Sequence, residues 1–250
     1  MLHKTYAAEL RSALGYLATW LPNSKLQLGD LLVPAGDGSL TRVGHIRDHG
    51  LSFTPHPGSS RAIYEYASSG AVSIMQKLAG QVVPGSSLAD ADAGFVVKFG
   101  RTDAIVFEAS GCSSVGIADL ISLGRAIEKK YAAGEWDRKW MLVTELVNAK
   151  AATIIIAGSQ SAQADLRASG TIGKGGIRLS DLNAKLEATK TVDIGFKIIT
   201  STGLTPLYRA SGIKRSWFGL GLGQFQTRSR EPKAGEPVAF ADFEPDDFLD

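Results

Sequence analysis

The stretch GFVVKFGRTDAIVFEAS, residues 94–110, determines the class of fold that the sequence predicts. Phe95, Val97 and Phe99 alternate with smaller or charged residues, and the segment after the polar tetrad GRTD alternates in the same way. A period of two is typical of strands that bury one face. The stretch therefore predicts two antiparallel strands joined in a hairpin by a turn at GRTD.

The hydrophobic period changes from two to 3.6 after this stretch, which predicts an internal helix that runs to about residue 131. Its apolar face comprises Ile117, Leu120, Ile121, Gly124, Ile127 and Tyr131. Beyond the helix, KWMLVTELV and AATIIIAG predict a long strand pair around NAK, and TVDIGFKII shows the clearest alternation in the chain. The residues of that segment predicted to share a face are Val192, Ile194, Phe196 and Ile198.

Strand-like segments also precede the opening stretch. KLQLGDLLV and LTRVGHI flank the turn cluster PAGDGS and predict a hairpin, and RAIYEYA predicts a further strand. AVSIMQKLAGQVV fits a helix and a strand equally well. Because strands do not alternate regularly with helices, we predict an α+β fold, a twisted and mostly antiparallel sheet with an N-terminal amphipathic helix and internal helices.

The N-terminal segment, residues 5–20, predicts an amphipathic helix that Pro22 ends. Its apolar stripe consists of Tyr6, Leu10, Leu14 and Leu17. A helix of this kind either packs on the core or binds a membrane surface through its apolar area. We predict that it is held against the body of the protein until it is released to a membrane.

Residue patterns for catalysis or metal binding are weak. His45, His49 and His56 lie close together in the sequence, but the residues around them predict a strand and a turn. This arrangement does not bring three ligands together around a metal ion. GTIGKGG lacks the spacing of a phosphate-binding loop, and nothing marks Cys112 as reactive. We therefore predict no catalytic residue, no metal and no cofactor. An enzyme that uses Cys112 or the histidines stays open as a third alternative.

The C-terminal residues differ in charge from the rest of the chain. Residues 231–250 hold seven acidic residues and one lysine, a net charge of −6, whereas the preceding 230 residues carry +8, which gives the total of +2. The same tail carries four large apolar residues, which are Phe240, Phe243, Phe248 and Leu249. Exposed aromatics do nothing for solubility and indicate docking in a groove, although an ordinary edge strand would explain them too. We divide the chain into a globular body, residues 1–224, and a linker with an acidic-aromatic peptide, residues 225–250.

The order of these elements resembles the pore-forming domain of the bacterial gasdermin family. The resemblance is carried by the run from Gly94 to about Gly170, which includes WMLVTELVNAKAATIIIAG, and by the closing segment KTVDIGFKIITSTGLTPLYRASGIK. It implies a latent pore-forming effector of cell death and antiviral defence, without catalytic residues, whose short C-terminal peptide inhibits it until a protease cuts. Bacterial members are associated with a lipidated cysteine near the N-terminus, and this chain has none there.

Several expectations about partners follow. An activating protease would cut the linker, for example after Arg228 or Arg230, and the freed body would bind anionic membrane lipids and oligomerise. GFVVKFGRTDAIVFEAS and AQADLRASGTIGKGGIRLS are the candidate membrane hairpins.

With one cysteine and neither a signal peptide nor a long apolar run, the intact protein is expected in the cytoplasm, and at the inner membrane after activation. The clusters of lysine and arginine residues in the sequence are small, and no nucleic-acid recognition motif accompanies them, so no nucleic-acid partner is expected. The alternative is a soluble binding module whose tail docks a partner.

Overall fold

The computed structural model describes residues 2–20, 25–35, 39–58, 63–169, 186–201, 203–215 and 238–242. Within these ranges lie two α-helices, α1 (Leu2–Leu14) and α2 (Leu120–Ala132), and one 3-10 helix, η1 (Ile46–His49). The strands are β1 (Leu17–Ala18), β2 (Asp30–Pro34), β3 (Leu40–His45), β4 (Pro55–Pro57), β5 (Ile63–Ala67), β6 (Val72–Lys77), β7 (Gly94–Phe99), β8 (Ile105–Ser110), β9 (Ser113–Ile117), β10 (Met141–Ala149), β11 (Ala151–Ala157), β12 (Gln163–Ala168), β13 (Leu186–Val192), β14 (Ile194–Ser201), β15 (Leu204–Arg215) and β16 (Val238–Asp242).

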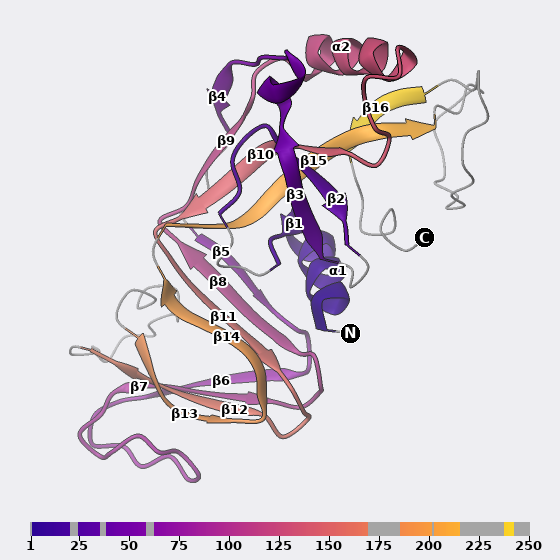
Figure 1. Ribbon diagram of the computed structural model, residues 1–250. Helices are drawn as coiled ribbons and strands as arrows, with labels where there is room; N and C mark the ends of the chain where they lie inside the picture. The colour runs from indigo at the N-terminus through magenta and orange to yellow at the C-terminus, as the bar shows by residue number, and fades with distance from the viewer. Residues whose placement is uncertain are drawn as a thin grey trace.

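The strands form three sheets, stacked from top to bottom in Figure 1. The upper sheet contains β4, β9, β10 and β15, with β1, β2, β3 and β16 added to them. The middle sheet has the order β14-β11-β8-β5, and the lower sheet has the order β13-β12-β7-β6. Every described strand pair is antiparallel, for example β10 with β15 and β11 with β14. The predicted α+β class with a mostly antiparallel sheet is therefore confirmed.

The middle and lower sheets are one four-stranded ribbon that is bent over itself. Each strand of the middle sheet continues through a short corner into one strand of the lower sheet, and the two strand orders correspond position by position. The ribbon consists of two long hairpins, β5 to β8 and β11 to β14 (Figure 1). It also continues upward, because β8 and β14 lead almost directly into β9 and β15, and β10 leads almost directly into β11.

The hairpin predicted at GRTD is wrong, because this turn is a corner of the ribbon. β7 pairs with β6 and β12, whereas β8 pairs with β5 and β11, so the two strands lie in different sheets. Two corner residues bond to neighbouring segments: the Gly100 N–H donates to the Ala71 carbonyl and the Asp103 N–H to the Ala157 carbonyl. Asp103 adopts φ +60, which redirects the chain.

Two other predicted strand arrangements need the same correction. β10 and β11 were predicted to pair around NAK, but β10 pairs with β15 and β11 with β14 and β8. TVDIGFKII is broken at Asp193, which has φ +50 and separates β13 from β14. As a result Ile194 packs between the sheets, while Phe196 and Ile198 face the opposite core.

The hydrophobic cores explain why the middle sheet lacks simple alternation. One core lies between the middle sheet and α1 and includes Tyr6, Leu10 and Phe107. A second core lies between the middle and lower sheets and includes Ile155 and Leu166. Because the middle sheet is covered on both faces, every residue of β11 is buried.

The predicted helices are present with shifted ends. α2 begins after its N-cap residue Asp119, so Ile117 ends β9 instead of starting the helix. α1 spans Leu2–Leu14, because Gly15 adopts φ +75 and its N–H bonds the Arg11 carbonyl. Leu17, predicted in the helical stripe, therefore lies in β1. The predicted hairpin over residues 25–46 is confirmed as β2 and β3, and the ambiguous segment 71–83 begins as strand β6.

Candidate functional site

The C-terminal strand β16 is seated on the body of the protein. It pairs antiparallel with the last residues of β15, from Ser211 opposite Asp242 to Arg215 opposite Val238, and lies beneath α2 (Figure 1). The Phe240 N–H donates to the Glu128 carboxylate in α2 at 2.9 Å. The Ser211 hydroxyl donates to the Asp242 carboxylate at 2.5 Å. The strand is thus held by backbone pairing and by two side chains of the body.

Phe240 fills the groove between β15 and α2. It packs on a core cluster that contains Leu123, Ile127 and Ile213. A Cβ atom added to Gly124 would lie 3.0 Å from the Phe240 ring, so this glycine gives the ring its place. Phe240 lies in the terminal strand β16 and packs on this cluster, and its role as an anchor of an inhibitory peptide stays a prediction. The described acid of the tail, Asp242, accepts a hydrogen bond from the Ser211 hydroxyl.

The other predicted tail and linker residues lie outside the described ranges. They are Phe243, Phe248 and Leu249 in the peptide and Arg228 and Arg230 in the linker.

We predict that Gly124→Leu displaces β16 from the body. The added side chain overlaps the position of Phe240, and overpacking of this kind costs about 1–3 kcal/mol. In a chain that ends at Arg230 the obstructed ring is absent, and the same substitution should stabilise α2 by up to about 1 kcal/mol through helix propensity. Urea unfolding of both chains measures the difference. Equal effects in the two chains would show that Phe240 does not depend on Gly124.

The predicted stripe of α1 is buried in the core. Tyr6 and Leu10 are 0% exposed, and Leu14 packs against the same core from its edge. The Tyr6 ring lies 5.8 Å from the Trp20 ring. Burial of the Tyr6 hydroxyl raises its pKa above the ordinary range for tyrosine. The helix is thus packed against the body by its apolar face.

Glu9 fixes the polar side of α1 at the corners of the ribbon. Its carboxylate accepts hydrogen bonds from the Tyr66 hydroxyl (2.8 Å), the Ser68 hydroxyl (2.6 Å) and the Arg101 guanidinium (2.7 Å). Partial burial would raise the pKa of Glu9, but these three bonds together hold the pKa below its ordinary value. The stabilisation they give is therefore present above the ordinary pKa of glutamate and is lost as the pH falls through the lowered pKa.

The segment between β6 and β7, residues 78–93, forms a strap held by two buried charged side chains. The Lys77 ammonium, 1% exposed, donates to the carbonyls of Ala89 (2.8 Å) and Asp92 (2.6 Å) and more weakly to that of Asp90. The Asp165 carboxylate, 0% exposed, accepts from Ser86 and Ser87 of the strap and from Gln163. Neither contact could be inferred from a sequence motif.

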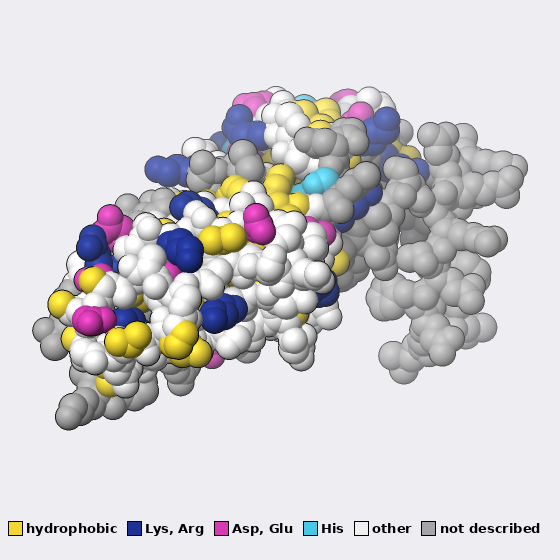
Figure 2. Space-filling view, turned by 90° about the horizontal axis from the view of Figure 1, so that it is seen from below, with side chains coloured by type: hydrophobic (Ala, Val, Ile, Leu, Met, Phe, Trp, Pro, Cys, Tyr) yellow, Lys and Arg dark blue, Asp and Glu magenta, His cyan; other side chains and the backbone are white. Residues whose placement is uncertain are grey.

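The view of the lower side of the molecule shows basic and acidic side chains interspersed with small hydrophobic patches (Figure 2). Large hydrophobic side chains on the lower-sheet strands are partly exposed, among them Ile74 (39%), Met75 (44%) and Val192 (37%). This face therefore carries no extended field of one sign in the described residues.

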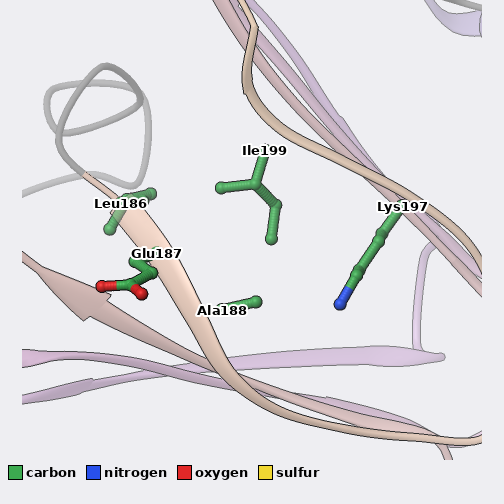
Figure 3. A pocket seen from close by; sticks show the side chains of 5 residues that line it. All are labelled: Leu186, Glu187, Ala188, Lys197 and Ile199. Carbon is green, nitrogen blue, oxygen red and sulfur yellow. The ribbon is translucent and has the colours of Figure 1, made fainter.

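A small pocket opens between the edge strands β13 and β14, with a volume of about 280 Å³. It is lined by Leu186, Glu187, Ala188, Lys197 and Ile199. Lys197 extends from β14 into the same space as Ala188 and Ile199 (Figure 3). Glu187 also lines the pocket, but its carboxylate points away from Lys197 (Figure 3) and is paired with Arg167, so the two side chains do not form an acid–base pair.

The histidines and the cysteine have structural surroundings. The His45 ring caps η1 by accepting from the Arg47 N–H, and the His49 ring lies 4.5 Å from the Trp140 ring. His56 is exposed in β4. Burial raises the pKa of the Cys112 thiol to about 11, so this thiol stays protonated at neutral pH. Over the described ranges, no three His, Cys, Asp or Glu side chains converge in a way that could hold a metal ion.

Comparisons with known proteins give a structural likeness only. No family model matches the sequence, and no curated protein matches it either. Among solved structures, the fold is similar to that of a bacterial gasdermin from Bradyrhizobium tropiciagri, with 16% sequence identity and a TM-score of 0.35. The alignment covers 86% of this chain and 88% of that chain. In the part of the chain that is described, neither α-helix has the length and hydropathy needed to cross a bilayer.

Proposed function

We propose that this protein is a latent, non-enzymatic pore former, a cell-death effector of the gasdermin type, and that its C-terminal peptide keeps it inactive. The observation that carries the proposal is the pattern of the bent ribbon. Along one strand of the ribbon, consider the apolar residues at every second position, which share one parity (odd or even residue numbers). They pack in the core between the sheets where the strand belongs to the lower sheet, and in the core under α1 where it belongs to the middle sheet. In a straightened strand they would all lie on one face.

The strand β7–β8 illustrates this pattern. Phe95, Val97 and Phe99 pack between the sheets, whereas Ile105 and Phe107, of the same parity, pack toward α1. In β11–β12, Ile154 and Ile156 belong to the core under α1, and Ala164, Leu166 and Ala168 lie between the sheets. In β13–β14, Leu186 and Ala188 lie between the sheets and Phe196 and Ile198 pack on the core under α1, while Ile194 at the start of β14 still packs between the sheets.

The opposite parity of these strands carries most of their charge. It includes Lys98, Glu108, Asp165, Arg167, Glu187 and Lys197. On a straightened ribbon most charges would lie on the face opposite the larger apolar stripe, as strands at the boundary between lipid and water require, with Val106 and Ile155 as apolar residues on the charged face. The length also fits, because β5–β6 runs over 15 residues and β11–β12 over 18, and a membrane-crossing strand needs about 9–11.

The edges of the ribbon support self-assembly in the membrane. β5 and β6 form one edge and β14 and β13 form the other. Each neighbouring pair is antiparallel, so β5 and β14 run in opposite directions. The β5 edge of one copy can therefore pair antiparallel with the β14 edge of the next, and each added copy leaves the same edge free.

The proposed inhibitor is the C-terminal peptide, of which β16 is the described part. A protease that cuts the linker, with Arg228 and Arg230 as candidate positions, would end the covalent attachment that keeps its local concentration high. The body would then lose a charge of −6 and keep +8, which favours an anionic membrane. We propose that the protein is cytoplasmic at rest, moves to the inner membrane on cleavage and acts in antiviral defence.

Expression in bacterial cells tests this function with a matched pair of variants. Ile74 pairs with Val97, on the apolar parity, and Ser73 pairs with Lys98, on the polar parity. Both residues are exposed in the folded protein, so arginine at either position leaves the cores intact. On a lipid-facing strand, however, an arginine costs about 2–4 kcal/mol near the bilayer midplane.

We expect a chain that ends at Arg230 to kill the cells that express it, as measured by colony counts. The same chain with Ser73→Arg should still kill, and with Ile74→Arg it should not. The full chain should be harmless. If the two arginine variants behave alike, the ribbon does not enter the membrane in the proposed orientation.

A soluble binding module remains the second candidate. It is favoured by one observation, the pairing of β16 with the edge of β15, because a strand from another protein could add to that edge in the same way. In that case the chain that ends at Arg230 would bind a strand-forming peptide without harming cells.

A further inference from the structure

The carboxylate of Glu9 joins helix α1 to two of the four corners of the ribbon. One oxygen accepts from Ser68, at the corner between β5 and β6, and from Tyr66 at the end of β5. The other oxygen accepts from Arg101, at the corner between β7 and β8. These two corners belong to the same hairpin, so a single side chain of α1 spans both of its bends.

Ser68 connects this contact to the backbone of the corner. Its side chain is buried, and its hydroxyl accepts from the Ile105 N–H at 2.9 Å while it donates to Glu9. The Ser68 N–H in turn donates to the Ile105 carbonyl at 2.9 Å. Glu9 therefore bonds Ser68, which follows β5 and is itself bonded to Ile105, the first residue of β8. Both strands leave the middle sheet at this pair of residues.

The corners of the second hairpin are held differently. There the Gly158 N–H donates to the Asp193 carbonyl at 2.7 Å, and the Ser159 hydroxyl donates to the Asp193 carboxylate at 3.2 Å. Both bonds run between the two strands of that hairpin and do not involve α1. The first hairpin has cross-strand backbone bonds of this kind too, but among the bonds described only its corners are also bonded to a side chain of α1.

We propose that α1 is a clasp that keeps the first hairpin bent, and that Glu9 is the residue through which it acts. The proposal rests on the proposed function, because it assigns the step that must precede straightening of β5–β6 and β7–β8. While α1 stays on the core, its carboxylate holds both bends. When α1 leaves for a membrane surface, the three bonds break together and the first hairpin is free to extend. The second hairpin is released by a separate event.

Hydrogen exchange on the intact full-length protein tests the clasp without any membrane. Glu9→Gln keeps the size of the side chain and removes its charge, and Lys4→Gln changes an exposed charge on the same helix. We expect Glu9→Gln to speed exchange of the Ser68, Gly100 and Ile105 amides on the order of tenfold, the factor for one charge-assisted hydrogen bond. Lys4→Gln should leave these amides unchanged, and neither variant should change the Gly158 amide.

Arg101→Gln provides a second variant, because it removes one of the three partners from a side chain that is 48% exposed. A smaller acceleration at the same amides is expected. The clasp is refuted if Glu9→Gln leaves the corner amides at the native rate, or if it accelerates the Gly158 amide as much as that of Ser68. These exchange rates do not depend on pore formation. The clasp hypothesis can therefore be refuted without refuting the pore-forming function, and the pore-forming function can be refuted without refuting the clasp hypothesis.

Discussion

Asp165→Ala is expected to lower the free energy of unfolding by about 3 kcal/mol, the largest loss from a single polar side chain in the lower sheet. The carboxylate accepts from the Ser87 N–H (2.5 Å) and hydroxyl (2.9 Å), from the Ser86 hydroxyl (3.2 Å) and from Gln163 (2.6 Å). Asp165 itself is 0% exposed, whereas its donors Ser86 and Ser87 are only partly buried or exposed. The loss therefore comes from removing hydrogen bonds to a charged acceptor, which contribute about 1.5–3 kcal/mol.

The matched control is Glu187→Ala on the neighbouring strand β13. Glu187 forms an ion pair with Arg167 at 2.6 Å, but both side chains are largely exposed, at 67% and 45%. Exposed pairs contribute about 0–1 kcal/mol, so this variant should unfold close to the native denaturant concentration. Denaturant unfolding followed by circular dichroism measures both. If Asp165→Ala is no more destabilised than Glu187→Ala, the strap is not held by the buried carboxylate.

The sequence predicts the strands more readily than it predicts their partners. Alternation in residues 94–110 identified two strands correctly, but it carries no information on whether GRTD closes a hairpin or turns a corner. That choice depends on the bonds from Gly100 and Asp103 to strands that are distant in the sequence. The alternation in TVDIGFKII is also continuous across a corner, and it was therefore interpreted as one strand. At Asp193 the chain turns into the other sheet, so residues of the same parity before and after the corner pack in different cores.

The candidate site could be predicted only in part. Phe240 stood out because aromatic residues are unusual in an acidic tail, and the structure places it against a hydrophobic cluster of the body. Glu9, Lys77 and Asp165 were missed, because isolated charges in apolar or small-residue segments look like ordinary surface residues until burial is known. The end of α1 was missed because Gly15 is compatible with a helix interior, and only its positive φ shows that the helix stops there.

The effect expected to be largest is on membranes, and it depends on the tail. The intact chain should leave dye-loaded liposomes sealed, because β16 occupies the edge of β15 and α1 stays on the core. The chain that ends at Arg230 has lost the peptide and its charge of −6, so it should bind anionic vesicles through the positive charge of the body. Raising the salt concentration should slow the release of dye, because salt screens this attraction.

The most direct test of the pore-forming account is dye release from anionic liposomes by the two purified proteins at equal concentration. The account predicts near-complete release with the chain that ends at Arg230 and none with the full chain. If the shortened chain folds, stays monomeric and releases no dye from liposomes of several compositions, the C-terminal peptide is not an inhibitor of a pore, and the binding module becomes the better explanation.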